Sequence, residues 1–329
     1  MKSAFTICSN NYLARAKVVA DSFVEHHPEA SFFIFLVDKF DPSLDYELFN
    51  KYTLIPIHEV LHHVEELALK YNIIELSTAV KPAAFSYLLQ MYGFETIAYL
   101  DPDLRIYSKF QEVENALQTH NIVLTPHFCS PVDDGKQPSD VDFIPFGIYN
   151  LGFIALKNSE ETRSFLAWWH ERLMKYCFIR PHDGMFTDQL WINYAPIFFE
   201  HCYVLKHLGY NMANWNLYER ELSESEGGYL VNSVFDLRFY HFSHYKSNNP
   251  YSISDSQNRF TLEERQDLQK LYVDYHKALI QNKHEQFSQV VSYYKLMYDG
   301  HKAAIKANEP PYSFKKKFKL KLKNMLTDD

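Results

Sequence analysis

The sequence predicts an α/β fold with a mostly parallel central sheet covered by helices. Patterns typical of buried strands alternate with helical patterns along the first half of the chain. Polar residues follow several of these strands directly, as they do at the ligand-binding edge of parallel sheets. The length of 329 residues suits one large domain with a C-terminal addition. We therefore expect a main domain over residues 1–260, a helical extension over 261–308 and a basic tail over 309–329.

Each element is predicted from its hydrophobic pattern and its end signals. We expect strands at Ala4–Ile7, Phe32–Val37, Thr53–Ile57, Thr96–Leu100, Asn121–Thr125 and Ile148–Leu156. We expect helices at Tyr12–His27, Glu59–Lys70, Ser77–Tyr92, Gln111–Gln118 and Glu160–Tyr176. Asn10 and Asn11 are candidate caps of the first helix, and Gly93 is the expected end of the third. The pattern from Leu262 to Lys306 is helical and polar.

Composition and charge exclude several classes of protein. The formal net charge is −8 although six lysines lie in the last fifteen residues, so the main domain is more acidic than the total and a poor binder of nucleic acid. The four cysteines are scattered without zinc-binding spacing, which indicates free thiols in a reducing compartment. No secretory signal and no run of 18 apolar residues is present, so we expect a cytoplasmic protein.

Ser9, Asp38 and Asp101 each lie at the end of a predicted strand. Because the carboxyl ends of parallel strands meet at one edge, these side chains are expected to face a common ligand. The Asp38 carboxylate could accept a hydrogen bond from a uracil N–H or a ribose hydroxyl, although an aspartate that caps a loop is an equal alternative.

Asp101 and Asp103 give the strongest chemical signal. They flank Pro102 at the end of the strand Thr96–Leu100, and in extended backbone residues two apart point the same way. Oxygen ligands of this kind suit Mg²⁺ or Mn²⁺, which usually share their coordination shell with substrate phosphates. A simple turn that ends the strand is the alternative interpretation.

The segment around Asp101 resembles the DxD motif of GT-A glycosyltransferases, and the resemblance covers about residues 3–250. The chain looks closest to bacterial glycosyltransferases related to family 8, which contains glycogenin-like and lipopolysaccharide galactosyltransferase-like enzymes. The matching segments follow the order of that family, and they are Thr6–Tyr12, Thr78–Pro82, Tyr149–Ala155, Thr187–Trp191 and Phe239–Ser243.

The resemblance implies a GT-A catalytic domain and a metal-dependent, retaining hexosyltransferase of surface polysaccharide synthesis. The donor would be a nucleotide sugar, with a UDP-sugar expected, and the acceptor a glycan or a lipid-linked oligosaccharide. By the same resemblance His241 would complete a site for Mn²⁺ or Mg²⁺ with Asp101 and Asp103. The expected catalytic residues are Asp188, Gln189 and Asn150, and the other expected contacts of the nucleotide sugar are Ser9, Asn10, Tyr12, Asp38, Lys81, Gly152 and Lys246.

Individual residues in this set also have ordinary explanations. Lys81 would add positive charge at the diphosphate, but it could also be a solvated helix residue. His241 could be a core histidine, and Asp188 could merely begin the helix at which it lies. Asn214, Trp215 and Asn216 combine hydrogen-bonding and stacking groups that could line the acceptor side, or they form an ordinary loop.

The segment after His241 departs from family 8, which places a glycine and a Lys-Pro-Trp motif there. This chain instead continues His241-Phe-Ser-His-Tyr-Lys246, so Lys246 could reach a diphosphate only with a different spacing. Two other functions stay open: a metal-dependent sugar nucleotidyltransferase and a non-catalytic carbohydrate-binding protein of the same fold. The first usually begins with a glycine-rich phosphate loop, which this sequence lacks.

The tail predicts contact with an anionic membrane surface. Phe314, Phe318, Leu322 and Met325 recur at helical spacing, and the lysines from Lys315 to Lys323 fall mostly on the other faces. Such a helix would place the protein on the inner face of the cytoplasmic membrane, near a lipid-linked acceptor. A solvated terminus is the alternative.

Overall fold

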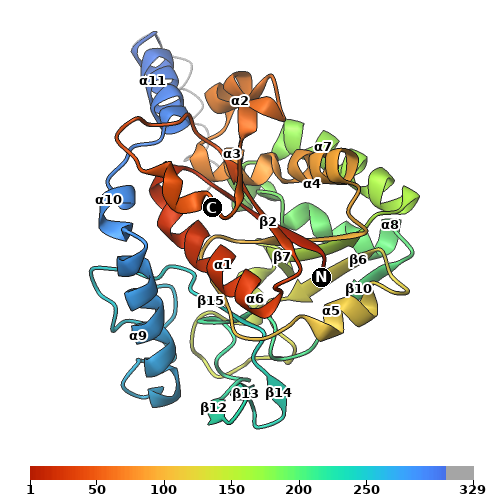
Figure 1. Ribbon diagram of the computed structural model, residues 1–329, viewed down its shortest axis with the longest axis vertical. Helices are drawn as coiled ribbons and strands as arrows, with labels where there is room; N and C mark the ends of the chain where they lie inside the picture. The colour runs from red at the N-terminus through yellow and green to blue at the C-terminus, as the bar shows by residue number, and fades with distance from the viewer. Residues whose placement is uncertain (309–329) are drawn as a thin grey trace, which may run out of the picture.

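The structure is a computed structural model that describes residues 1–308. A seven-stranded sheet with helices on both faces forms its centre, which confirms the predicted α/β class (Figure 1). The strands, in order across the sheet, are β10 (Cys202–Val204), β6 (Ile122–Pro126), β7 (Tyr149–Lys157), β4 (Thr96–Leu100), β1 (Ser3–Cys8), β2 (Ser31–Leu36) and β3 (Thr53–Pro56).

Most neighbouring strands of this sheet run parallel. β1 pairs in parallel with β2 and with β4, β2 pairs in parallel with β3, and β10 with β6. β7 is the exception, because it runs antiparallel to both β4 and β6. The sequence pattern predicts β7 as a buried strand but carries no information on its direction.

The two faces of the sheet belong to different hydrophobic cores. Along β1, Phe5 and Ile7 point to one core and Ala4 and Cys8 to the other, as the alternation of side chains in a strand requires. The first core lies under α2 (Val64–Lys70), α3 (Ile73–Ala79), α4 (Lys81–Tyr92) and α7 (Glu160–Tyr176). The second lies under α1 (Leu13–His26) and α5 (Gln111–Ala116).

The predicted helix Ser77–Tyr92 is in fact two helices, α3 and α4, which meet at Val80. Asn72 and Glu75 form a capping box that begins α3 before the predicted start. Pro82 lies in the first turn of α4, where its missing N–H costs no helical hydrogen bond. Gly93 ends α4 with a φ of 65°, as predicted.

The predicted cap of the first helix is wrong. A 3-10 turn over Asn10–Tyr12 precedes α1, and neither the turn nor the helix has a side-chain cap. The Asn10 amide instead donates to the Lys39 carbonyl, and its oxygen accepts from the Tyr46 hydroxyl. Asn10 therefore ties the loop after β1 to the loop after β2.

A second small sheet lies beside the carboxyl end of β4. β15 (Phe239–His241) is its central strand, with β11 (Met212–Ala213) parallel on one side and β5 (Leu104–Ile106) antiparallel on the other. This sheet brings residues near 240 next to the turn that follows β4. The remaining elements are α6 (Asp140–Phe143), β8 (Ile179–Arg180), β9 (Met185–Phe186), α8 (Ala195–Phe198), β12 (Leu222–Ser225), β13 (Gly228–Val231) and β14 (Phe235–Asp236).

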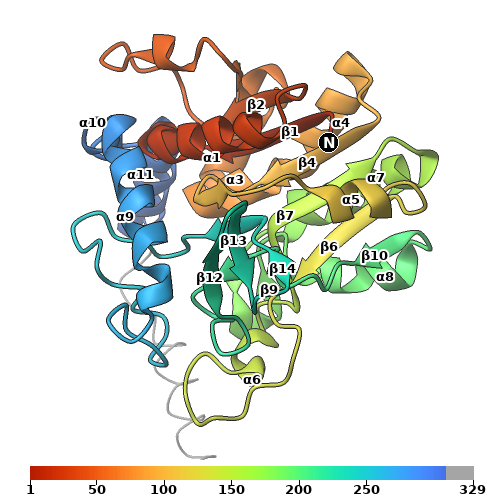
Figure 2. The same cartoon turned by 60° about the horizontal axis from the view of Figure 1, so that its bottom comes forward.

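The C-terminal extension consists of three helices: α9 (Gln266–Gln281), α10 (His284–Ser288) and α11 (Tyr293–Asn308). α9 and α10 pack against α1, and α11 packs against α2, so the extension lines one side of the sheet (Figure 2). Within residues 1–308, no helix has the length and apolar content needed to cross a bilayer. The predicted membrane-binding tail, Lys315–Lys323, lies outside the described residues.

We expect His27 to make the fold sensitive to acid. Its Nε2 accepts from the Phe110 backbone N–H at 3.1 Å, and its ring stacks on Phe23 in the second core. Burial lowers the pKa of His27 from 6.5 to about 4, so the unfolded chain binds the proton more readily. The free energy of unfolding should therefore fall between pH 6.5 and pH 4, by up to about 3 kcal/mol from this histidine.

Urea unfolding of wild type and His27→Gln across this pH range checks the prediction. The variant should be less stable at pH 7 and should lose less stability on acidification than wild type does. Equal pH dependence in both proteins would show that His27 does not contribute.

Candidate active site

Asp101, Asp103 and His241 form a cluster of metal-ligating side chains at the carboxyl edge of the sheet. His241 Nε2 lies 3.2 Å from Asp103 Oδ1 and 3.8 Å from Asp101 Oδ2. One ligand atom from each residue lies within 4.8 Å of the others, and this is the cluster of that kind found among residues 1–308. The two aspartates lie in the turn that directly follows β4, and His241 is the last residue of β15. The structure thus brings together the three residues that the sequence predicts as metal ligands.

Asn211 fixes the orientation of the His241 ring. Its Oδ1 lies 3.2 Å from His241 Nδ1, while its Nδ2 faces the Thr125 hydroxyl at 3.4 Å. The amide oxygen therefore accepts from Nδ1–H, and the Nε2 lone pair is directed at the two aspartates. A hydrogen bond of this kind is the usual support of a metal-bound histidine. Two carboxylates and one imidazole fit Mn²⁺ or Mg²⁺, as predicted from the sequence.

The charges in the cluster shift one another's pKa values. Burial opposes the imidazolium form of His241, but the carboxylates of Asp103 and Asp101 outweigh it and raise the pKa of His241. Burial raises the pKa of Asp101, against the lowering effect of Lys81. Burial acts in the same direction on Asp103, but His241 and Arg15 lower the pKa of Asp103 overall. The cluster is thus a group of interacting charges, with His241 buried and both aspartates half-buried, to which a cation would bind favourably.

Gly152 on β7 leaves room at the centre of this cluster. Its carbonyl accepts from the Asp101 N–H at 2.8 Å, which ties the DxD turn to β7. A Cβ atom at Gly152 would lie 2.6 Å from His241 Cε1 and 2.8 Å from both Asn150 Oδ1 and Asp101 Oδ2. A glycine is required here by close approach of side chains and not by backbone conformation.

We expect Gly152→Ala to weaken metal binding by at least about tenfold, because the added methyl must displace His241 or Asp101. Calorimetric titration with Mn²⁺ measures this change. Gly227→Ala is the matched control, since a Cβ there meets no atom within 4 Å. Equal Mn²⁺ affinity in Gly152→Ala and wild type would show that the cluster is not the metal site.

Lys81 and Asp188 form a buried ion pair next to the cluster. Lys81 Nζ lies 2.5 Å from Asp188 Oδ2, 2.9 Å from the Leu151 carbonyl and 4.0 Å from the centre of the Tyr99 ring. The two side chains are 2% and 3% exposed. The alternative explanation of Lys81 as a solvated helix residue is thereby excluded. Lys81 instead neutralises Asp188. Tyr99 in turn donates to Asp101 Oδ1 at 2.5 Å. Tyr99 therefore contacts both the ion pair and the metal-ligating cluster.

The helix expected after Asp188 is a short 3-10 helix, and Asp188 does not cap it. This helix covers Leu190–Tyr194, with Gln189 as the N-terminal flanking residue. Thr187 before Asp188 has a φ of 44°, which is unusual for a β-branched residue, and its hydroxyl donates to Asp188 Oδ1. Both oxygens of the Asp188 carboxylate are therefore engaged, and a strained backbone of this kind is often found at functional sites.

The amides of Asn150 and Gln189 are held in fixed orientations. Asn150 Oδ1 accepts from the Gly152 N–H, so its Nδ2 faces His127 Nε2 at 3.1 Å. Gln189 Oε1 accepts from the Leu151 N–H, and its Nε2 donates to the Phe146 carbonyl. Burial lowers the pKa of His127 to about 3, so the ring is neutral and accepts from Asn150. These contacts hold the β7 segment beside the metal cluster.

Asn214, Trp215 and Asn216 are buried in the wall behind His241. Trp215 packs edge-to-face on the His241 ring at 5.2 Å, and its Nε1 donates to the His127 carbonyl. Asn216 donates to the same carbonyl, and Asn214 donates to the Ser243 carbonyl. All three side chains donate to backbone carbonyls. Their contact with an acceptor stays a prediction.

The predicted nucleotide side of the site gathers around the ends of β1 and β2. Ser9 donates to Asn11 Oδ1, and the Tyr12 ring is 42% exposed. Asp38 is only 1% exposed. Its carboxylate accepts three backbone N–H groups, from Asn10 at 3.1 Å, Lys39 at 3.0 Å and Tyr293 at 2.8 Å.

Asp38 thus fastens the start of α11 to the sheet edge, and burial raises the pKa of Asp38 against these three donors. Its predicted bond to a nucleotide would compete with them. Lys246 is likewise engaged elsewhere, because it pairs with Asp255 at the surface and its side chain is 53% exposed. The structure therefore does not bring Lys246 into the cluster.

Three residues of the site were missed in the sequence: Arg15, His127 and Asn211. Arg15 lies in the first turn of α1, where its charge lowers the pKa of Asp103. His127 directly follows β6, so the rule that ligands meet at strand ends could have found it. Asn211 has a φ of 54° and carries no motif of its own, so its role depends on the packing of β11 against β15.

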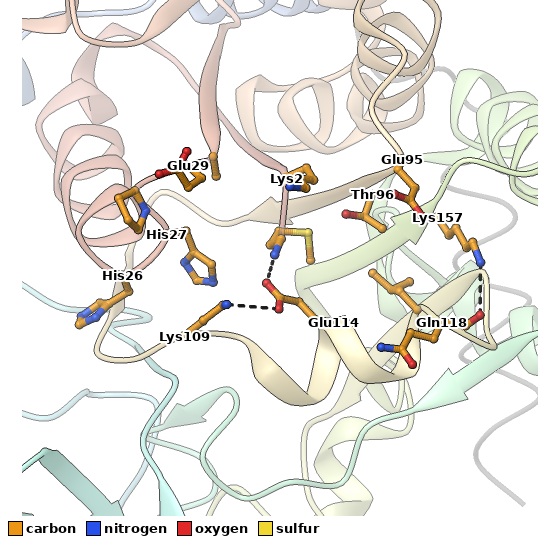
Figure 3. Close-up of a pocket in the computed structure, with 14 residues that line it drawn as sticks. Lys2, His26, His27, Glu29, Glu95, Thr96, Lys109, Glu114, Gln118 and Lys157 are labelled. Atoms are coloured by element: carbon orange, nitrogen blue, oxygen red, sulfur yellow. Dashed lines mark hydrogen bonds and ion pairs between the residues drawn. The ribbon is translucent and has the colours of Figure 1, made fainter.

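A large pocket of about 760 Å³ lies at the opposite edge of the sheet (Figure 3). Some of its charged groups pair with one another or with backbone. Glu114 contacts Lys109 and the Met1 amino group, and Lys157 donates to the Gln118 carbonyl. The pocket is thus separate from the cluster and offers no comparable set of ligands.

The fold is similar to that of solved GT-A glycosyltransferases. The galactosyltransferase LgtC, solved in complex with donor and acceptor sugar analogues, matches 91% of this chain and 99% of its own length with a TM-score of 0.50 and 12% identity. The glycosyltransferase GlyE of Streptococcus pneumoniae TIGR4 matches 88% of this chain and 66% of its own length with a TM-score of 0.48 and 12% identity. The predicted GT-A fold is thereby confirmed.

Two proteins of Bacillus subtilis (strain 168) are similar in sequence. The uncharacterized protein YfnF is 26% identical over 259 residues, which cover 75% of this chain and 82% of YfnF. The uncharacterized protein YfnD is 25% identical over 244 residues, which cover 72% of this chain and 76% of YfnD. No protein-family model matches the chain.

Proposed function

We propose that the protein is a metal-dependent glycosyltransferase that uses a nucleotide sugar, with a UDP-sugar as the first candidate donor. The observation that carries the proposal is the cluster of Asp101, Asp103 and His241 at the carboxyl edge of a GT-A sheet. The similarity to LgtC, a galactosyltransferase solved in complex with donor and acceptor sugar analogues, supports a sugar donor and a glycan acceptor. Oxygen and nitrogen ligands favour Mn²⁺ or Mg²⁺.

The reaction breaks the bond between the sugar and the diphosphate, so negative charge grows on the departing phosphate. A divalent cation held by the cluster would supply fixed positive charge there. The residues of this chain provide the rest of the site. Lys81 holds the Asp188 carboxylate in place by a buried ion pair, so that the charge of Asp188 can stabilise the positive charge that develops at the anomeric carbon. Asn150 and Gln189, whose amides are held by backbone groups, give the donor sugar a fixed wall.

The resemblance to family 8 favours retention of the anomeric configuration. Both Asp188 oxygens are engaged by Lys81 and Thr187, which agrees with a role as an electrostatic partner and not as an attacking nucleophile. NMR of the first-formed product decides the stereochemistry. An inverted anomer would remove retention from the proposal and make Asp188 a candidate general base.

Contact with a lipid-linked acceptor at an anionic membrane is proposed from the sequence alone, because Lys315–Lys323 lies outside the described residues. Flotation with phosphatidylglycerol liposomes compares the full chain with a chain that ends at Tyr312. Equal flotation of both chains would remove the tail from the proposal.

The experiment that tests the proposed activity is release of nucleoside diphosphate from a panel of UDP-, GDP-, ADP- and dTDP-sugars by the full-length protein. We expect slow hydrolysis of one or a few of these donors with Mn²⁺ or Mg²⁺ and its loss with a chelator. Binding of the same donor should raise the melting temperature. Neither hydrolysis nor thermal stabilisation by any donor in the panel would contradict the proposal.

A further inference from the structure

Arg15 is a buried cation without an ion-pair partner in the part of the chain that the structure describes. The residue is 8% exposed, and no carboxylate lies within 4.0 Å of its guanidinium among residues 1–308. It donates from Nη2 to the Tyr245 carbonyl at 2.9 Å, and the Tyr275 side chain lies beside it. A guanidinium has five N–H donors and remains charged at any ordinary pH. Asp103 is the carboxylate whose charge acts on Arg15, and a divalent cation bound at the cluster would take up that charge. The buried guanidinium would then lack a counter-charge, which indicates that an anionic ligand supplies one.

The surroundings of Arg15 place that ligand beside the metal cluster. The residue lies in the first turn of α1, the 14-residue helix whose start follows the strand-end loop after β1. The Tyr245 residue that it binds belongs to a turn whose Phe242 N–H donates to the Asp103 carbonyl at 2.9 Å. The guanidinium carbon also lies 5.3 Å from the centre of the Tyr12 ring. The N-terminus of a helix carries partial positive charge and unpaired N–H groups, so the end of α1 and Arg15 favour the same anion.

The other two candidate cations of the site are already neutralised. Lys81 is paired with Asp188 in the interior, and Lys246 is paired with Asp255 at the surface. The charge of a divalent cation would equal the combined charge of the Asp101 and Asp103 carboxylates, so no net positive charge would remain for the diphosphate. The diphosphate of a nucleotide sugar is negative and becomes more so when the sugar leaves. An additional cation is therefore needed, and Arg15 is in a position to supply it.

We propose that Arg15, together with the N-terminus of α1, binds the diphosphate of the donor beside the metal cluster. This inference rests on the proposed function, because it names the group that neutralises the leaving nucleoside diphosphate. It assigns to Arg15 the contact with the diphosphate that the sequence pattern suggested for Lys246, in the segment after His241. The planar guanidinium can donate two parallel hydrogen bonds to phosphate oxygens, which a lysine cannot do.

The test measures three affinities by calorimetry for wild type, Arg15→Gln and Arg15→Lys. The probes are Mn²⁺ alone, the nucleoside diphosphate among UDP, GDP, ADP and dTDP that binds wild type most tightly with saturating Mn²⁺, and the corresponding nucleoside. In Arg15→Gln the affinity for the diphosphate should fall by about tenfold to a hundredfold, the effect of a lost charge-assisted hydrogen bond. Nucleoside affinity should be unchanged, and Mn²⁺ affinity unchanged or higher, since a repelling charge is removed. The diphosphate affinity of Arg15→Lys should lie between those of wild type and Arg15→Gln.

Arg163→Gln is the matched control, because Arg163 is an exposed arginine on α7 that donates to Asn158. Equal diphosphate affinity in wild type and Arg15→Gln would overturn the inference and leave the proposed function intact. Equal losses for all three probes would also overturn it, since they would show a purely structural role. If wild type binds none of the four nucleoside diphosphates, the proposed function fails and the inference fails with it.

Discussion

Replacing Asp103 by asparagine is expected to lower metal-stimulated turnover of the nucleotide sugar by about 10²–10³-fold. Asp103 Oδ1 is the carboxylate oxygen nearest to His241 Nε2, at 3.2 Å, so the substitution removes a ligand and a negative charge from the centre of the cluster. The fold should survive, because an asparagine has the same shape and the turn after β4 is held by the backbone bond from Asp101 to Gly152.

Release of nucleoside diphosphate at increasing Mn²⁺ concentration measures this effect. Asp299→Asn is the control, since Asp299 lies on the exposed face of α11 and its ion-pair partner among residues 1–308 is Lys295. Excess Mn²⁺ should restore part of the activity if the loss comes from weaker metal binding. Wild-type turnover in Asp103→Asn, or turnover that does not depend on metal in either protein, would contradict the assignment.

Replacing Lys81 by methionine is expected to lower the free energy of unfolding by about 3–5 kcal/mol. The substitution leaves the Asp188 carboxylate buried with the Thr187 hydroxyl as its remaining partner, and Asp188 is 2% exposed. Removing one member of a buried pair costs more than the pair contributes, because the other charge stays in the interior. Activity should fall as well, since Lys81 would no longer hold the Asp188 carboxylate in position beside the donor sugar.

Urea unfolding of Lys81→Met, Asp188→Asn and the double variant separates the contributions. The double variant should be more stable than the sum of the two single changes predicts, because it removes both charges together. It should still be inactive, since the Asp188 charge is lost. A cost below about 1 kcal/mol for Lys81→Met would contradict the buried ion pair.

The parts of the fold that could be predicted are those with local signals. The hydrophobic patterns of β1, β2, β4 and β6 and the end signal at Gly93 depend only on neighbouring residues. The break between α3 and α4 was missed because the capping box of Asn72 competes with a continuous helical pattern. The antiparallel direction of β7 could not be predicted from the sequence pattern, because it depends on the pairing of β7 with β4 and β6.

The same distinction applies to the site. Asp101 and Asp103 could be predicted because a strand end fixes their direction, and His241 because its segment resembles a known motif. The partners of Lys81 and Asp38 could not, since Asp188 is 107 residues from the first and Tyr293 is 255 residues from the second. Arg15 was missed because its importance comes from its burial beside the metal cluster, which becomes visible only when α1, Tyr12 and Tyr245 are placed together.

The central claim is that Asp101, Asp103 and His241 bind one divalent cation together with the donor diphosphate. Anomalous diffraction from crystals of the protein soaked with Mn²⁺ and the nucleoside diphosphate that binds most tightly tests it most directly. The account predicts one manganese peak, about 2.0–2.3 Å from an oxygen of each aspartate and from His241 Nε2, in contact with phosphate oxygens. A peak elsewhere with none at the cluster, or a nucleotide bound with no metal between the cluster and its phosphates, would contradict it.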